Sequence, residues 1–139
     1  MVRRLLPLLL LLGGCSSTPD VQLSCGIVSG YLEPPAAEHL YRVVVTHLND
    51  KAVLSRPNFR LSPGVYRFTL AELIDDPRLK VALAARGTKY LDLKVEAGKR
   101  YHLAAQLYTD KPYVGNNPDY WQPKVWQEEA VECEPDVQN

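Results

Sequence analysis

The sequence has little of what metalloenzymes, nucleotide-binding enzymes and nucleic-acid-binding proteins need. Its three histidines, His39, His47 and His102, form no H-x-H or H-E-x-x-H spacing, and there is no C-x-x-C pair. The nucleophile elbow G-x-S-x-G, the phosphate loop and the dinucleotide fingerprint are also absent. Sixteen basic residues balance 16 acidic ones, which leaves no basic stripe for nucleic acid. We therefore expect no enzyme, no catalytic residues, no metal and no cofactor, with His102 an exposed strand residue. An enzyme is the least favoured alternative, and a cleft that gathers His47 or His102 with acidic residues would support it.

The chain also lacks the length for two full-sized domains. It has 139 residues, of which 46% are hydrophobic and 23% charged, a composition typical of one globular domain. A continuous apolar run of roughly 20 residues, the length that a membrane-spanning helix needs, is missing as well. The longest apolar segment is the leucine-rich Leu5–Leu12, interrupted by Pro7. A permanent transmembrane helix is therefore not expected.

What the first residues do contain is an export pattern. Arg3 and Arg4 form a basic start, the leucine run follows, and small residues precede Cys15. This order of basic, apolar and small residues predicts a signal peptide over residues 1–14. A soluble secreted protein, cleaved near Gly14, is one interpretation of the same pattern.

The tetrad Leu12-Gly13-Gly14-Cys15 resembles the lipobox of bacterial lipoproteins. The resemblance implies that Cys15 is lipidated on sulfur, for example with palmitate, and becomes the acylated N-terminus. In that family an Asp after the lipidated Cys marks inner-membrane retention, and this chain has Ser16 instead. The resemblance thus implies a lipid anchor in the outer membrane of a Gram-negative cell, on its periplasmic face. Several acyl chains give stable anchoring that one chain cannot.

The two cysteines that remain are Cys25 and Cys133. In an oxidising compartment such a pair is expected to form a disulfide, which here would enclose nearly the whole domain. The alternative is two separately buried thiols.

The mature chain divides into a short tether over residues 15–20, a β domain over residues 21–134 and a polar tail over residues 135–139. Short apolar runs with period two, separated by Gly, Pro, Asn and Asp, predict a mainly β fold with antiparallel strands. We expect a first hairpin from Leu40–His47 to Lys51–Ser55, turning at Asn49-Asp50. After the break at 61–64, residues 65–70 alternate as a strand.

A second hairpin is predicted from Tyr90–Val95 to Arg100–Tyr108, and a last strand over Ala130–Cys133 that the disulfide would bring beside the first. Between the hairpins, Asp76-Pro77 and Gly87 have the order of a helix cap, a first-turn proline and a terminal glycine. These signals slightly favour a short helix around residues 77–86. The alternation of Leu79, Val81 and Leu83 also permits a strand.

Two phrases carry a resemblance to a fold family. Residues 61–68, Leu-Ser-Pro-Gly-Val-Tyr-Arg-Phe, and residues 93–103, Leu-Lys-Val-Glu-Ala-Gly-Lys-Arg-Tyr-His-Leu, resemble segments of small immunoglobulin-like and PEGA-type β-sandwiches of bacterial envelope proteins. The resemblance implies a single antiparallel immunoglobulin-like sandwich. Within it Tyr101 is expected as a tyrosine corner, with its ring buried and its hydroxyl bonded to nearby backbone. Sandwiches host many tasks, so this implies no activity.

Aromatic residues gather near the C-terminus. Five of the twelve, including both tryptophans, lie within nineteen positions: Tyr108, Tyr113, Tyr120, Trp121 and Trp126. Most of this window is expected to be loop, since Pro and Gly recur in it. One interpretation is a core anchor sealed by tyrosines. The other is an exposed contact surface of Tyr113, Tyr120, Trp121 and Trp126 for a glycan or a protein.

Residues 120–126, Tyr-Trp-Gln-Pro-Lys-Val-Trp, are similar to a phrase in proteobacterial lipoproteins that carries no assigned activity. Together these patterns predict a membrane-anchored envelope lipoprotein that acts as a non-catalytic interaction or structural module. Its expected partners are the membrane, through the lipid, and an envelope protein, with no nucleic acid. The alternative is a module that binds peptidoglycan or another glycan through the aromatic surface.

Overall fold

A computed structural model describes residues 24–134 of the chain. The expected signal peptide over residues 1–14, the lipidated Cys15, the tether over residues 15–20 and the polar tail over residues 135–139 lie outside the described residues. In the described part, no helix has the length and apolar character to cross a membrane.

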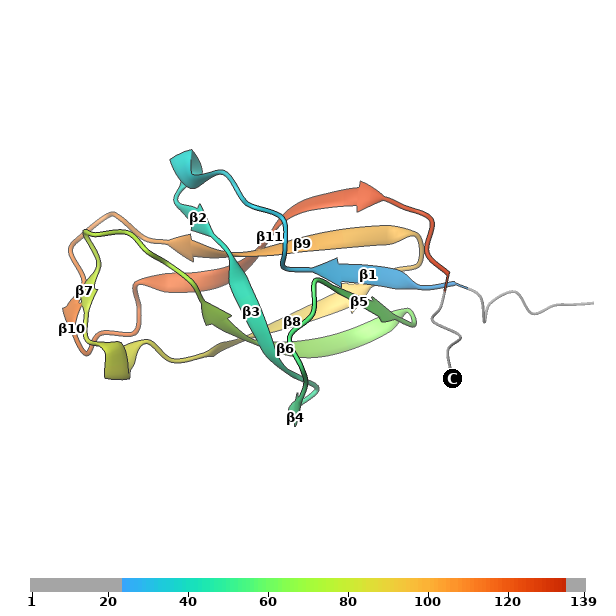
Figure 1. Ribbon diagram of the computed structural model, residues 1–139, viewed down its shortest axis with the longest axis horizontal. Coiled ribbons are helices and arrows are strands. Elements are labelled where there is room, and N and C mark those ends of the chain that lie inside the picture. Colours follow the sequence, from blue (N-terminus) through green and yellow to red (C-terminus); the bar gives the residue numbers. More distant parts are fainter. Residues whose placement is uncertain (1–23, 135–139) are drawn as a thin grey trace, which may run out of the picture.

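The described residues form a β-sandwich, as predicted (Figure 1). The larger sheet has the order β11-β9-β1-β5, with β2 also paired to β9, and the smaller has the order β4-β3-β6-β8. The larger sheet contains β1 (Gly26–Ser29), β2 (Leu40–Tyr41), β5 (Asn58–Leu61), β9 (Lys99–Leu107) and β11 (Trp121–Ala130). The smaller contains β3 (Val43–Leu48), β4 (Lys51–Ala52), β6 (Gly64–Glu72) and β8 (Lys89–Val95). Most pairs are antiparallel, but β1 runs parallel to β9.

The core lies between the two sheets because alternate residues of each strand point inward. From the larger sheet come Val28, Phe59 and Leu103, and from the smaller come Phe68 and Leu70, each 5% exposed or less. This two-sided burial is what the period-two pattern of the sequence encodes.

The first predicted hairpin is confirmed in its turn and its pairing, because β3 and β4 pair with register Leu48↔Lys51. Its strands are shorter than predicted, since Leu40–Tyr41 pair with β9 in the other sheet and β4 ends at Ala52. Its two turn residues have left-handed backbone, with φ of 52° at Asn49 and 66° at Asp50. Asn and Asp tolerate this region, and two such residues make the turn whose twist suits a hairpin.

The second predicted hairpin is wrong in its pairing, although both strands exist. β8 pairs with β6 in the smaller sheet, whereas β9 pairs with β1, β2 and β11 in the larger one. The turn at Gly98, where φ is 79°, carries the chain across the sandwich. Local alternation is the same for a hairpin and for such a crossing, so the sequence pattern could not distinguish them.

Tyr101 has the role that was expected for it at this crossing. Its ring is 3% exposed, and its hydroxyl accepts a hydrogen bond of 3.0 Å from the backbone N–H of Glu96. β1 passes close to the same turn, since a Cβ at Gly26 would stand 2.5 Å from the carbonyl oxygen of Glu96. The tyrosine and the glycine together fix how the turn packs on β1.

The short helix slightly favoured around residues 77–86 is replaced by other structure. The two-residue strand β7 (Lys80–Val81) runs parallel to β10 (Val114–Gly115), and a 3₁₀ turn, η3, spans Leu83–Ala85. Another 3₁₀ turn, η2, spans Ala36–Glu38. Val81 is buried while Leu83 is 82% exposed, so the segment has no buried helical stripe to stabilise a helix. The side chain of Asp76, expected as a helix cap, instead accepts a hydrogen bond from the backbone N–H of Arg78 and so stabilises a local turn.

The last strand is longer and earlier than predicted. β11 spans Trp121–Ala130, where a loop was expected, and β9 separates it from β1. It is an edge strand, where Pro123 is tolerated, and its register shifts between Val125 and Gln127. This irregularity changes which residues face inward on either side of it.

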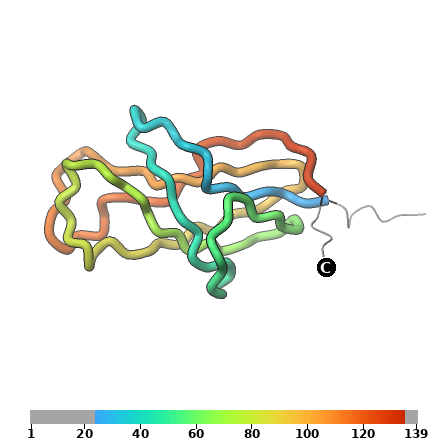
Figure 2. Tube along the Cα trace, in the orientation of Figure 1, coloured from blue at the N-terminus to red at the C-terminus, as the bar shows by residue number. Residues whose placement is uncertain are grey.

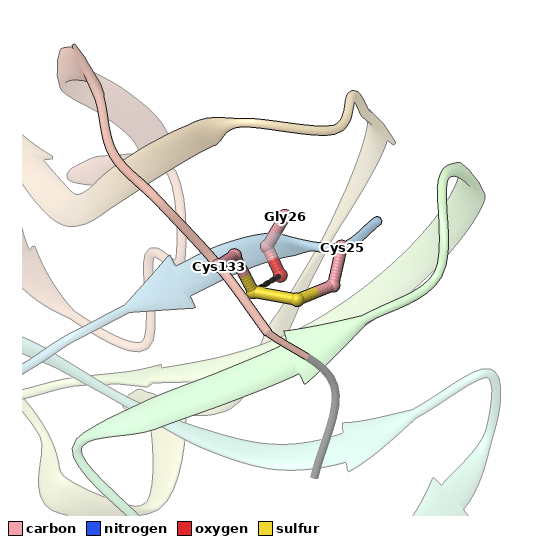
Figure 3. The surroundings of a disulfide bond; sticks show 3 residues. All are labelled: Cys25, Gly26 and Cys133. Atoms are coloured by element: carbon pink, nitrogen blue, oxygen red, sulfur yellow. Dashed lines mark hydrogen bonds between the residues drawn. A yellow bond between two sulfur atoms is a disulfide. The ribbon is translucent and has the colours of Figure 1, made fainter. Parts of the chain in front are cut away.

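The predicted disulfide joins Cys25 to Cys133, with their Cα atoms 5.4 Å apart. Figure 3 shows it beside β1, linking the start of that strand to the segment after β11, with Cys133 Sγ 3.9 Å from the carbonyl oxygen of Gly26. Figure 1 shows β7 and β10 at the opposite end of the sandwich. We call these the disulfide end and the distal end.

Candidate functional site

The segment from Tyr108 to Tyr120 connects β9 to β11 and forms much of the distal end (Figure 2). At its base, the N–H of Tyr108 donates to the carbonyl of Tyr120 over 2.8 Å. Near its tip, the carbonyl of Gly115 accepts from Ala82 N–H over 2.5 Å, beside the β7–β10 pair. The segment is therefore fastened at both its base and its tip.

The expected aromatic contact surface is wrong for three of its four residues. Tyr113, Tyr120 and Trp121 are 7%, 0% and 1% exposed, and all three belong to the main core cluster. Lys89 reaches across from β8 and donates to the carbonyl of Trp121 over 2.6 Å. The core-anchor interpretation holds for these rings because the fold turns them inward, where they close the distal end of the sandwich.

Trp126, the fourth residue, is half-buried on the outer side of the larger sheet. Its ring lies 5.9 Å from the ring of His102, tilted by 46°. His102 was expected to be exposed, but it is 1% exposed, and its Nε2 lies 2.6 Å from a carboxylate oxygen of Glu129. Trp126 on the neighbouring strand helps cover it, so the expectation for His102 is wrong.

A buried polar network stabilises the distal end from within the core. The carboxylate of Glu72, at the end of β6, accepts from the hydroxyl of Tyr120, from the guanidinium of Arg86 at 2.8 Å and from the N–H of Ile74 at 2.8 Å. Arg86 also donates to the carbonyl of Ile74 over 2.6 Å. The network ties β6, the segment after η3 and the start of β11 together.

The charges in this network are set by opposing effects. Burial by itself would raise the pKa of Glu72, but the hydrogen bonds from Arg86, Tyr120 and Ile74 outweigh it and lower that pKa. Burial and the neighbouring carboxylate raise the pKa of Tyr120. At neutral pH the carboxylate of Glu72 is ionised and is held by the guanidinium of Arg86 and the phenol of Tyr120. In this structural arrangement the acceptor oxygens of the carboxylate have hydrogen-bond donors.

Two hollows lie against the segment Leu107–Asp110 and Tyr113, and we call them together the distal cleft. The first has a volume of about 360 Å³ and is also lined by Arg78, Leu79, Lys111 and Pro112. The second has a volume of about 510 Å³ and is also lined by His39, Gln106 and Asp119. Sequence reasoning placed a contact surface in the loop region that contains Tyr108 and Tyr113. It gave no role to Arg78, Leu79 or Gln106, because these join the lining only when β2, β7 and the 108–120 segment meet.

Hydrogen bonds hold the polar groups of the distal cleft in place. The hydroxyl of Tyr113 donates to Asp110 over 3.1 Å, and the ammonium of Lys111 lies 5.5 Å from the centre of the Tyr113 ring. Arg78 pairs with Asp76 at 2.6 Å, and its hydrogen bonds hold the pKa of Asp76 far below the ordinary range. The cleft thus presents fixed cations, carboxylates and a tyrosine edge.

This arrangement suits the binding of a polar partner by hydrogen bonds and ionic contacts. Across residues 24–134, no group of three or more His, Cys, Asp or Glu side chains is arranged to hold a metal ion. His39 borders the cleft and His47 lies on β3, where its Nδ1 is 2.8 Å from the hydroxyl of Thr46.

Comparisons of the chain with protein-family models, with curated proteins and with solved structures found no significant match.

Proposed function

We propose that the chain is an outer-membrane lipoprotein whose sandwich is a non-catalytic interaction module, with the distal cleft as its contact site. The observation that supports this proposal is that the start of the described chain and the cleft lie at opposite ends of the domain. The described chain begins at the disulfide end, nine positions after Cys15, while the loop after β9, whose residues line the cleft, lies at the other end. Nine extended residues reach at most about 30 Å, so a lipid on Cys15 would keep the disulfide end near the membrane and turn the cleft outward.

An envelope protein is the favoured partner at this site. Leu83 is 82% exposed and Val114 59% exposed, on η3 and β10 beside the cleft. Exposed apolar side chains next to polar groups are typical of protein contact sites. The glycan alternative depended on stacking by Tyr113, Tyr120 and Trp121, and the burial of these rings removes its main support.

The anchor is tested by Cys15→Ser in the full chain. We expect this variant to lose fatty-acid labelling and to leave the membrane fraction, with Cys25 and Cys133 still bridged. A variant that stays in the outer membrane would overturn the anchor.

The contact site is tested by in-cell photo-crosslinking from position 111, with position 94 on β8 as the exposed control. We expect a discrete adduct from position 111 that is absent from position 94 and is lost when Asp110→Arg changes the charge of the cleft. Protease and muramidase digestion of the adduct distinguish a protein from a glycan. Equal adducts from both positions would contradict a contact site at the cleft.

A further inference from the structure

The buried side-chain polar atoms that have no hydrogen-bond partner within residues 24–134 all lie on one face of the sandwich. They are Ser29 Oγ, Asn58 Oδ1, Arg100 Nε, His102 Nδ1 and Trp126 Nε1. Each belongs to a strand of the larger sheet and lies on the side that points away from the core. A buried polar atom without a partner costs free energy, so this face indicates a bound molecule.

Three of these atoms lie in one row across neighbouring strands. Ser29 of β1 is opposite Asn58 of β5 on one side and opposite His102 of β9 on the other. Neighbouring strands are about 4.8 Å apart, so Asn58 and His102 are separated by about twice that distance, with Ser29 between them. The preceding pair in the register, Val28 and Phe59, is in the core, so the row faces outward.

The row is shielded from bulk solvent. Ser29 and His102 are each 1% exposed, and Trp126 helps to cover His102. Serine has the shortest side chain of the three, so a small molecule held above Ser29 would contact Asn58 on one side and His102 on the other. These three residues do not line the distal cleft. Such an enclosed position suits a molecule of one heavy atom better than a peptide or a sugar.

The hydrogen bond with Glu129 determines what His102 offers to the row. His102 Nε2 lies 2.6 Å from a carboxylate oxygen of Glu129. This bond lowers the pKa of Glu129, so at neutral pH the carboxylate is ionised and only accepts. Nε2 therefore carries a hydrogen, and in the neutral ring Nδ1 is left as an acceptor. Asn58 Oδ1 is a second acceptor, whereas the Ser29 hydroxyl can donate.

We propose that an internal water molecule binds above Ser29, donating to His102 Nδ1 and Asn58 Oδ1 and accepting from the Ser29 hydroxyl. A water molecule has two hydrogens to donate, and internal waters make about three hydrogen bonds to buried polar groups. The water completes a polar row that runs from β5 through β1 and β9 to Glu129 on β11. It thereby links these four strands and holds His102 in one tautomer. The site is separate from the distal cleft.

The chemistry of the row favours water over an ion. An anion at this place would face two acceptors, His102 Nδ1 and Asn58 Oδ1, and both would repel it. A cation would have only neutral groups to bind, since the Glu129 carboxylate is held by His102 Nε2 and by Arg100 at 3.5 Å. Arg100 Nε and Trp126 Nε1 are both donors, and neither has a part in this site.

The test detects long-lived water molecules in the full chain, in detergent. Oxygen-17 relaxation dispersion of the solvent counts internal waters, and water cross peaks in NOE spectra locate them. We expect cross peaks from water to the backbone amides of Ser29 and His102, and none to the amide of Leu70, which is 0% exposed in the smaller sheet. The nitrogen shifts of His102 should show a hydrogen on Nε2 and a hydrogen-bonded Nδ1 without one.

Ser29→Val should remove the signal of one water, because the larger apolar side chain takes its place and offers no hydroxyl. The matched control is Thr69→Val, at a side chain 6% exposed in the smaller sheet, which should leave the water count unchanged. Asp110→Arg should also leave it unchanged, so that this site and the distal cleft are tested separately. If Ser29→Val does not fold, the wild-type cross peaks decide. Equal dispersion of the wild type and a folded Ser29→Val, no water cross peaks at Ser29 and His102 in the wild type, or a hydrogen on His102 Nδ1 would overturn the proposal.

Discussion

At the scale of single residues, Glu72 shows how a charge can be stable inside an apolar core. Its side chain is 1% exposed, yet it accepts hydrogen bonds from Arg86, from Tyr120 and from a backbone N–H. Removal of the Glu72 carboxylate is costly because its donors lose their acceptor in a place that water cannot reach.

We predict that Glu72→Gln lowers the free energy of unfolding by about 3 kcal/mol, since Arg86 would keep its charge without an ionic partner. Urea denaturation at neutral pH measures this. The matched control is Glu128→Gln on β11, whose side chain is 53% exposed and which should change stability by less than about 0.5 kcal/mol. Equal effects of the two substitutions would contradict the structural role of Glu72.

The same residue predicts a pH dependence. The pKa of Glu72 is lowered in the folded state, so its stabilising contribution is full above the ordinary glutamate pKa of about 4.3 and is lost as the pH falls below it. The stability difference between the wild type and Glu72→Gln should therefore shrink between about pH 5 and pH 3. A difference that stays constant over this range would show that the carboxylate charge is not the cause.

No local pattern marked Glu72 as special. Its partner Tyr120 is 48 positions away in the chain, and the sequence pattern assigned Tyr120 to an aromatic contact surface and not to a buried network. The turn residues Asn49 and Asp50 and the role of Tyr101 were predictable, by contrast, because each follows from the few residues around it.

At the scale of elements, the β3–β4 hairpin depends on two residues with left-handed backbone. Asn49 has a second role, because its side-chain oxygen accepts a hydrogen bond of 2.8 Å from the N–H of Arg67. Asp50 makes no such bond in the described structure. The two turn positions should therefore respond differently to glycine.

We predict that Asp50→Gly raises the free energy of unfolding by about 0.5 kcal/mol, since glycine adopts a positive φ without steric cost. Asn49→Gly should lower it by about 1 kcal/mol through loss of the hydrogen bond to Arg67. Thermal and urea unfolding of the two variants give the signs directly. The same sign for both would contradict the separate roles assigned to them.

Strand positions were more predictable than strand partners. Lys89–Val95 and Lys99–Leu107 lie close to where alternation put them, but they belong to different sheets. Pairing depends on which inward faces meet across the core, and this is not encoded within either strand.

At the scale of the whole molecule, the disulfide connects two segments that no strand pairing joins. Cys25 precedes β1 and Cys133 follows β11, and β9 lies between those strands. The bridge spans a sequence separation of 108, so it restricts a large part of the unfolded chain.

We predict that the double variant Cys25→Ser, Cys133→Ser loses about 2–4 kcal/mol of unfolding free energy. Reduction of the wild type should lower its urea midpoint to that of the double variant, which serves as the control for effects of serine itself. Two free thiols in the folded, unreduced wild type would contradict the bridge.

The sequence by itself determined the mainly β fold, the first hairpin and its turn, the bridged cysteine pair and the burial of Tyr101. These depend on residues that are near one another in the chain, or on the number of cysteines. Only the tertiary structure decided that the 90–108 strands separate into two sheets, that three of the four aromatics turn inward, and that Glu72, Arg86 and Tyr120 meet. It also decided where the distal cleft lies. The physical reason is that burial and pairing arise between distant residues, when two sheets close on one core.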